Sequence, residues 1–118
     1  MQFKPPKNDA KYQWTNHVQQ KMMYYGISES LIKRITRFPK RIEEGIAPKT
    51  VAVMQPTSSK KHEVWVMYQE IGKKPAGGGS ASGRKKIISA WKYPGISPIG
   101  KKIPIPDEIL QELSEVLE

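Results

Sequence analysis

The 118-residue chain contains no cysteine, which excludes disulfide frameworks, thiolate metal sites and cysteine nucleophiles. Hydrophobic residues make up 37% of the sequence, a fraction that fits one small folded domain and excludes a wholly disordered chain. Lysine and arginine number 20 against 11 acidic residues, a formal charge of +9, and no run approaches the ~18 apolar residues of a membrane span.

The charge divides the chain into a basic body and an acidic end. Residues 103–118 contain five carboxylates and no lysine or arginine, so the 20 cations of residues 1–102 face only six carboxylates. A body with this excess of cations attracts polyanions, which favours nucleic acid as a partner. The alternative is a basic protein whose charge serves only solubility. The first residues lack the apolar run of a signal peptide, so we expect a cytoplasmic protein without a membrane partner.

The distribution of glycine, proline and polar residues predicts one domain with two irregular segments. Residues 1–13 mix lysine, proline and polar residues without periodicity, so we expect a flexible basic arm before a single domain at 14–118. Residues 73–84 read KKPAGGGSASGR, which predicts a mobile loop between two strands. A phosphate-binding P-loop would open a helix, whereas a strand pattern follows here.

Two short helices are predicted after the arm. The first spans residues 16–25, where apolar residues recur at helical spacing and Gly26 follows at the position of a left-handed C-cap. Ser28 caps the second helix, and Pro39 ends its apolar stripe. The short connection between the two helices predicts an αα-hairpin.

Strand-like runs follow at residues 41–46, 50–55, 63–71 and 85–93. In the third run Val64, Val66 and Tyr68 alternate with Trp65 and Met67, so both faces are apolar and the strand should be central. A four-stranded antiparallel meander is the simplest arrangement of these runs.

A last helix is predicted from about Pro106, with apolar residues on one stripe and acidic residues elsewhere. We consider three roles for this helix. Its apolar stripe packs on the domain, the helix docks on a partner, or the helix covers the basic surface when no RNA is bound. The predicted fold class is therefore α+β, with an N-terminal helical hairpin on a small four-stranded antiparallel sheet and a C-terminal amphipathic helix.

Three stretches together resemble a bacterial and phage family grouped with the BrnT-like and RelE-like toxins of toxin–antitoxin systems. They are WTNHVQQKMMYYGIS at 14–28, VWVMYQ at 64–69 and KKIISAWKYPGISP at 85–98. The resemblance implies a RelE/BrnT-like fold, metal-independent endoribonuclease activity on messenger RNA, association with ribosomes and an acidic antitoxin as protein partner. The alternative is a non-catalytic RNA-binding or protein-interaction module of the same fold.

RNA cleavage without a metal needs a base, cations that stabilise the phosphorane, and an acid. His17 is the candidate base, because its unperturbed pKa of about 6.5 suits proton transfer at neutral pH; the alternative is a structural histidine at the helix start. Arg37, Lys86 and Tyr93 complete the candidate catalytic set, with packing as the alternative for Tyr93. His62 is expected to be an exposed turn residue. Neither histidine has a second ligand at metal-binding spacing, so no metal or other cofactor is expected.

Cations from several predicted elements are candidates to bind nucleic acid. Those of the second helix and those that open the last strand are placed to hold phosphates from two sides. The full candidate set is Lys21, Lys33, Arg34, Arg84, Lys85 and Lys92. For each one the alternative is a solvated cation with no ligand. Trp91 is expected in the core.

Overall fold

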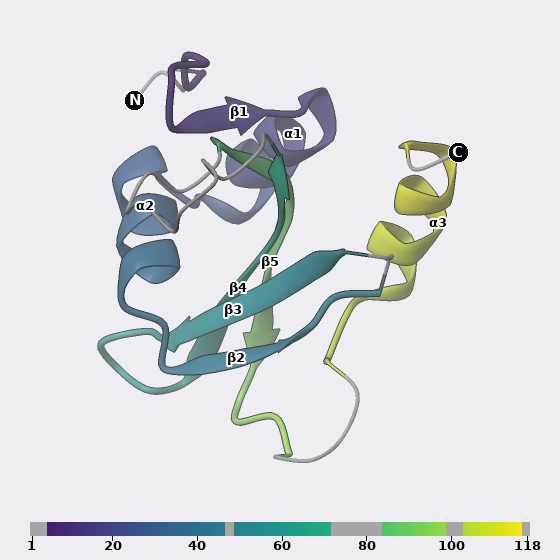
Figure 1. Ribbon diagram of the computed structural model, residues 1–118. Coiled ribbons are helices and arrows are strands. Elements are labelled where there is room, and N and C mark those ends of the chain that lie inside the picture. The colour runs from purple at the N-terminus through teal and green to yellow at the C-terminus, as the bar shows by residue number, and fades with distance from the viewer. Residues whose placement is uncertain (1–4, 47–48, 72–83, 99–102, 117–118) are drawn as a thin grey trace.

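The computed structural model of the protein describes residues 5–46, 49–71, 84–98 and 103–116 (Figure 1). The predicted glycine-rich loop lies outside these ranges, apart from Arg84. In chain order the described elements are β1 (Tyr12–Trp14), α1 (Asn16–Tyr25), α2 (Glu29–Arg37), β2 (Arg41–Glu44), β3 (Thr50–Pro56), β4 (His62–Ile71), β5 (Arg84–Pro94) and α3 (Asp107–Val116). The protein is therefore an α+β protein, as predicted.

The strands form a mixed sheet of five strands in the order β1-β5-β4-β3-β2. Strands β2 to β5 make the predicted antiparallel meander, but β1 adds a fifth strand parallel to β5. The prediction of a four-stranded antiparallel sheet is wrong in this detail. Strand β1 contains only three residues, two of which fall in the predicted arm, and so short a run shows no alternation. Its register becomes clear only from pairing with residues more than 70 positions away, as in Tyr12 with Lys85.

Local signals explain the ends of the first two helices. The Thr15 side chain accepts a hydrogen bond from the Val18 N–H at the start of α1, and Gly26 ends this helix at φ 68°. Ser28 caps α2 in the same way as Thr15 caps α1. The helices pack on different strands, α1 on β5 and α2 on β3 and β4. The structure thus differs in detail from the predicted helical hairpin, because each helix packs on its own strands of the sheet.

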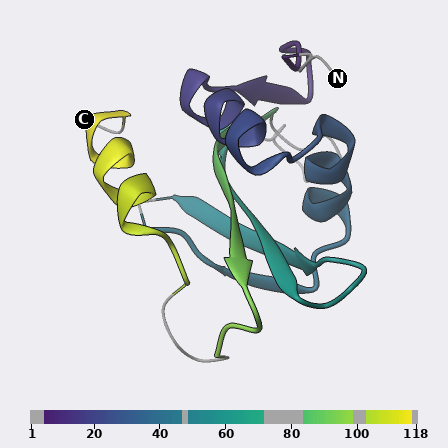
Figure 2. The ribbon, with the colours of Figure 1, turned by 180° about the vertical axis from the view of Figure 1, so that it is seen from behind.

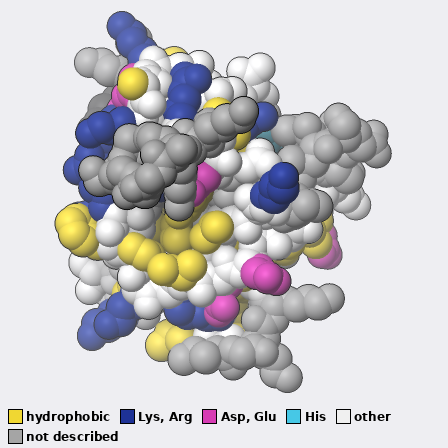
Figure 3. Space-filling view, in the orientation of Figure 1, with side chains coloured by type: hydrophobic (Ala, Val, Ile, Leu, Met, Phe, Trp, Pro, Cys, Tyr) yellow, Lys and Arg dark blue, Asp and Glu magenta, His cyan; other side chains and the backbone are white. Residues whose placement is uncertain are grey.

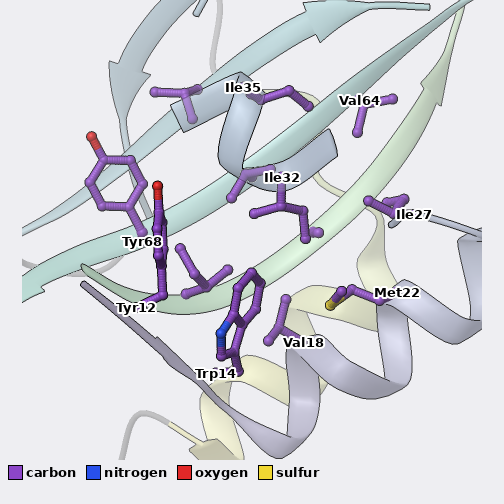
Figure 4. Close-up of a cluster of buried hydrophobic side chains, with 13 residues drawn as sticks. Tyr12, Trp14, Val18, Met22, Ile27, Ile32, Ile35, Val64 and Tyr68 are labelled. Carbon is purple, nitrogen blue, oxygen red and sulfur yellow. The ribbon is translucent and has the colours of Figure 1, made fainter. Parts of the chain in front are cut away.

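The sheet buries apolar side chains on both faces. Beneath α1 and α2 the core contains Tyr12, Trp14, Val18, Met22, Ile27, Ile32, Ile35, Val53, Val64, Val66, Tyr68, Ile87 and Ala90 (Figure 4). On the other face it contains Ala52, Met54, Trp65, Met67, Ile88, Trp91, Ile103, Ile109 and Leu113. Alternate residues of β4 enter the two clusters, which confirms that β4 is central. Trp91 is a core residue, and its Nε1 donates to the Pro104 carbonyl at 2.8 Å.

Helix α3 lies on the side of the sheet away from α2 (Figures 1 and 2). Its apolar stripe packs on the second cluster through Ile109 and Leu113. The stripe therefore packs on the domain, the first of the predicted alternatives. Within the described part of the chain, no helix is long and apolar enough to cross a bilayer.

Candidate functional site

His17, the predicted catalytic base, lies at the start of α1 with only 6% of its surface exposed. Its Nε2 lies 2.9 Å from Ser89 Oγ on β5, and its Nδ1 lies 3.2 Å from Glu112 Oε2 on α3. The register between β4 and β5 shifts next to Ser89, a β-bulge of the kind that re-aims side chains. The three side chains link elements that are distant in the sequence.

Lys21 follows His17 by one helical turn and shares its carboxylate partner. The Lys21 Nζ lies 2.9 Å from each carboxylate oxygen of Glu112. Burial is the main cause that lowers the pKa of His17, with Lys21 adding to it and Glu112 opposing it. The imidazole is therefore neutral at neutral pH. The tautomer that satisfies both contacts donates from Nδ1 to Glu112 and accepts at Nε2 from the Ser89 hydroxyl.

A serine, a histidine and a carboxylate in this order also make up a nucleophilic triad. A catalytic serine must reach its substrate, whereas Ser89 is fully buried. A base for RNA cleavage must likewise reach a 2′-hydroxyl, whereas His17 is buried and both of its ring nitrogens already contact Ser89 and Glu112. The geometry favours the structural alternative for His17, in which it ties α1 to β5 and α3.

Lys33 of α2 lies beside β1. Lys33 Nζ pairs with Glu29 Oε2 at 2.7 Å and lies 5.3 Å from the centre of the Tyr12 ring. The Tyr12 hydroxyl lies 3.3 Å from Thr36 Oγ1, which attaches β1 to the same helix. Arg34 and Arg37 are exposed in the last turn of α2.

The cations that open β5 reach the same region from the other side. Lys85 Nζ lies 5.7 Å from the centre of the Tyr68 ring and 4.0 Å from Glu70 Oε1. Tyr12 and Tyr68 belong to one buried cluster and lie close together in Figure 4. Lysines from α2 and β5 therefore flank a pair of neighbouring tyrosines.

Asp9 connects the two groups of cations. Its pKa is lowered, first by the backbone N–H groups of Tyr12 and Lys11 that bond its carboxylate, and also by the charges of Lys33 and Arg84. Figure 3 shows lysine and arginine side chains gathered over α2 and the segment around β1. We call this region the basic surface and define it as Lys11, Lys33, Arg34, Arg37, Arg84 and Lys85.

The remaining predicted residues lie elsewhere. Lys21 is buried against Glu112, and Lys86 points to the face of the sheet opposite to Lys85 because side chains alternate along β5. Tyr93 and Lys92 lie at the far end of β5, roughly 20 Å from Lys86 at the usual rise per residue. The four predicted catalytic residues are therefore not brought together.

No protein-family model, curated protein or solved structure matches this chain. The resemblance to BrnT-like and RelE-like toxins, the ribonuclease activity and the acidic antitoxin therefore stay predictions. The functional conclusion therefore rests on the geometry of the side chains.

The sequence interpretation missed Ser89 and Glu112 as partners of His17. Ser89 belongs to an apolar strand, and its position depends on the bulge. Glu112 is one of several carboxylates on α3, and only the docking of that helix selects it. No spacing in the sequence signals either contact.

A cavity of about 350 Å³ lies at the other end of the sheet, lined in part by Lys40, Arg41, Lys60 and His62. His62 is exposed there, as predicted. The buried carboxylate of this region, Glu63, accepts bonds from Trp65 Nε1 at 3.1 Å and from the Ser97 backbone N–H at 3.2 Å and Oγ at 2.6 Å. These contacts give Glu63 a structural role that holds the segment after β5.

Proposed function

We propose that the protein binds single-stranded RNA through the basic surface, without cleaving it. The observation that carries the proposal is the convergence of cations from α2, β5 and the segment before β1 beside Tyr12 and Tyr68. Phosphates bind where several lysines and arginines lie together, and such binding needs no deep pocket.

An exposed aromatic ring supports single-stranded RNA over a duplex. Phe38 directly follows Arg37 and is 70% exposed. Unpaired bases stack on exposed rings while neighbouring cations hold their phosphates, an arrangement that a base-paired helix cannot use. Phe38 at the end of α2 thus provides a stacking position beside two arginines.

Absence of cleavage follows from the position of the candidate base. His17 is buried, its ring contacts Ser89 and Glu112, and it lies outside the basic surface. RNA held on the basic surface would have its 2′-hydroxyl groups away from this imidazole. Cleavage without a metal would then lack its predicted base.

Fluorescence anisotropy with a labelled RNA of about 20 nucleotides tests binding at low salt. The variant R34Q/R37Q should raise the dissociation constant about tenfold, because it removes two phosphate contacts. The control K60Q/K61Q removes the same charge from exposed lysines of the turn before β4 and should change binding less than about twofold. Absence of binding, or equal losses in both variants, would contradict the proposal.

Denaturing gels of the same samples test cleavage, with and without ribosomes. We expect intact RNA throughout. Strand scission that disappears in His17→Ala, while folding is preserved, would instead support the endoribonuclease predicted from the family resemblance.

A further inference from the structure

Strand β2 forms one edge of the sheet and pairs only with β3 among the described residues. The N–H of Gly45 donates to the Thr50 carbonyl at 3.0 Å, in a register that pairs Arg41 with Met54 and Glu43 with Ala52. Backbone groups alternate in direction along an antiparallel strand. Those of Ile42 and Glu44 therefore point outward from the sheet.

This edge of the sheet exposes an apolar side chain to solvent. Ile42 is 64% exposed, on the face of the sheet that carries α1 and α2. Arg41 and Glu43 point to the opposite face, where their side chains pair at 2.6 Å. Lys40 and Glu44 are exposed on either side of Ile42. An edge strand with an exposed isoleucine is a template for pairing with another strand.

The charges around Ile42 are arranged so that the segment complements itself. Residues 40–44 read Lys-Arg-Ile-Glu-Glu, with two cations before the isoleucine and two carboxylates after it. A strand that carries one sign of charge repels its own copy, whereas this segment matches its own copy when reversed. We propose that two copies of the chain pair antiparallel through β2, with Ile42 at the two-fold axis, and so form one continuous sheet.

The symmetry selects the register. A two-fold axis perpendicular to the sheet keeps each side chain on its own face. Residues directly opposite each other in an antiparallel pair also share a face, so the axis must pass between a residue and its own copy in the partner. With Ile42 on the axis, Arg41 lies opposite the partner's Glu43, and Lys40, which directly precedes the strand and donates its N–H to the Met54 carbonyl, lies near the partner's Glu44. An axis at Arg41 or Glu43 would instead place like charges directly opposite each other.

This register also uses the outward backbone groups. Ile42 would exchange both backbone hydrogen bonds with the partner's Ile42, because its N–H and C=O already point out of the sheet. The Arg41–Glu43 ion pair of each chain would lie against the inverted pair of the other, giving four alternating charges. The interface is short, so we expect a dimer that dissociates on dilution.

Sedimentation velocity of the full chain over about 1 to 500 µM tests the proposal. We expect a concentration-dependent dimer. The variants K40E and E44K each create two pairs of like charges across the two-fold axis and should raise the dissociation constant about tenfold or more. The double variant K40E/E44K restores opposite charges in reversed order and should return the constant to within about threefold of the wild-type value.

Matched controls separate this interface from other causes. K7E makes the same charge change at an exposed residue before β1, at the opposite edge of the sheet, and should leave dimerisation unchanged. Circular dichroism checks that all variants are folded. A monomer at every concentration, a dimer insensitive to K40E and E44K, or a double variant as weak as the single variants would overturn the proposal.

Discussion

At the scale of single residues, His17 shows how a contact between distant elements determines the behaviour of an ionisable group. It is neutral because burial outweighs the attraction of Glu112, and Lys21 adds repulsion. Protonation would leave two neighbouring cations, His17 and Lys21, to share one carboxylate. The free energy of unfolding should therefore depend on whether His17 is protonated.

We expect the free energy of unfolding to fall as the pH drops below about 6.5. The unfolded chain has the ordinary histidine pKa of about 6.5, whereas the folded pKa is lower, so between these values the unfolded chain binds more protons. The His17 contribution is thus complete above about 6.5 and is lost towards the folded pKa. Urea unfolding between about pH 7.5 and 5 measures the slope.

His17→Gln should flatten this pH dependence, because the variant has no imidazole to protonate. His62→Gln removes the exposed histidine at the start of β4 and should keep the wild-type slope. If His17→Gln and the wild type lost stability in parallel over this range, burial of the His17 imidazole would not cause the effect.

At the scale of elements, α3 illustrates how one helix combines packing with a polar contact. Its apolar stripe covers Trp91 and its neighbours, and its Glu112 reaches the buried pair on α1. Since the carboxylate of Glu112 bonds His17 and Lys21, it is not available to shield the basic surface. Helix α3 also packs on the face of the sheet away from α2, so the structure does not favour it as a cover for that surface.

Leu113→Ala should lower the free energy of unfolding by about 2–4 kcal/mol, because it leaves a cavity between α3 and the sheet. Leu113 is 1% exposed, whereas Leu110 on the same helix is 38% exposed. Leu110→Ala is the matched control and should cost less than about 1 kcal/mol. Denaturant unfolding measures both variants, and equal losses would show that α3 does not dock through this stripe.

At the scale of the whole molecule, the sheet separates two functional edges. Lys33 and Lys85 of the basic surface lie near β1 and β5, whereas the self-complementary strand β2 forms the opposite edge and follows directly after α2. A dimer through β2 would leave the cations beside β1 and β5 accessible, because they lie at the opposite edge of the sheet. The two proposals are tested by different variants and different measurements, so each can fail without the other.

The salt dependence of RNA binding should report the number of phosphates bound. The logarithm of the binding constant should fall linearly with the logarithm of the salt concentration, by about 0.7 per phosphate contacted on single-stranded RNA. R34Q/R37Q should therefore reduce the slope by about 1.4 in anisotropy titrations. A weaker affinity with an unchanged slope would mean that the arginines do not contact phosphates.

Much of the secondary structure was predictable because its signals are local. Gly26 and Ser28 delimit α1 and α2, and the two-sided apolar pattern from Val64 to Tyr68 identified a central strand. The site was less predictable. A cationic helix face and a cationic strand start can be recognised separately, but only the fold shows that Lys33 and Lys85 lie beside neighbouring rings.

The sequence by itself determined the α+β class, the antiparallel order of β2 to β5, and the division into a basic body and an acidic helix. These features follow from residues a few positions apart, whose spacing matches a helix or a strand. Only the tertiary structure decided the parallel pairing of β1, the burial of His17 and the outward edge of β2. Each of these depends on which distant segments pack together, and that choice minimises the free energy of the whole chain.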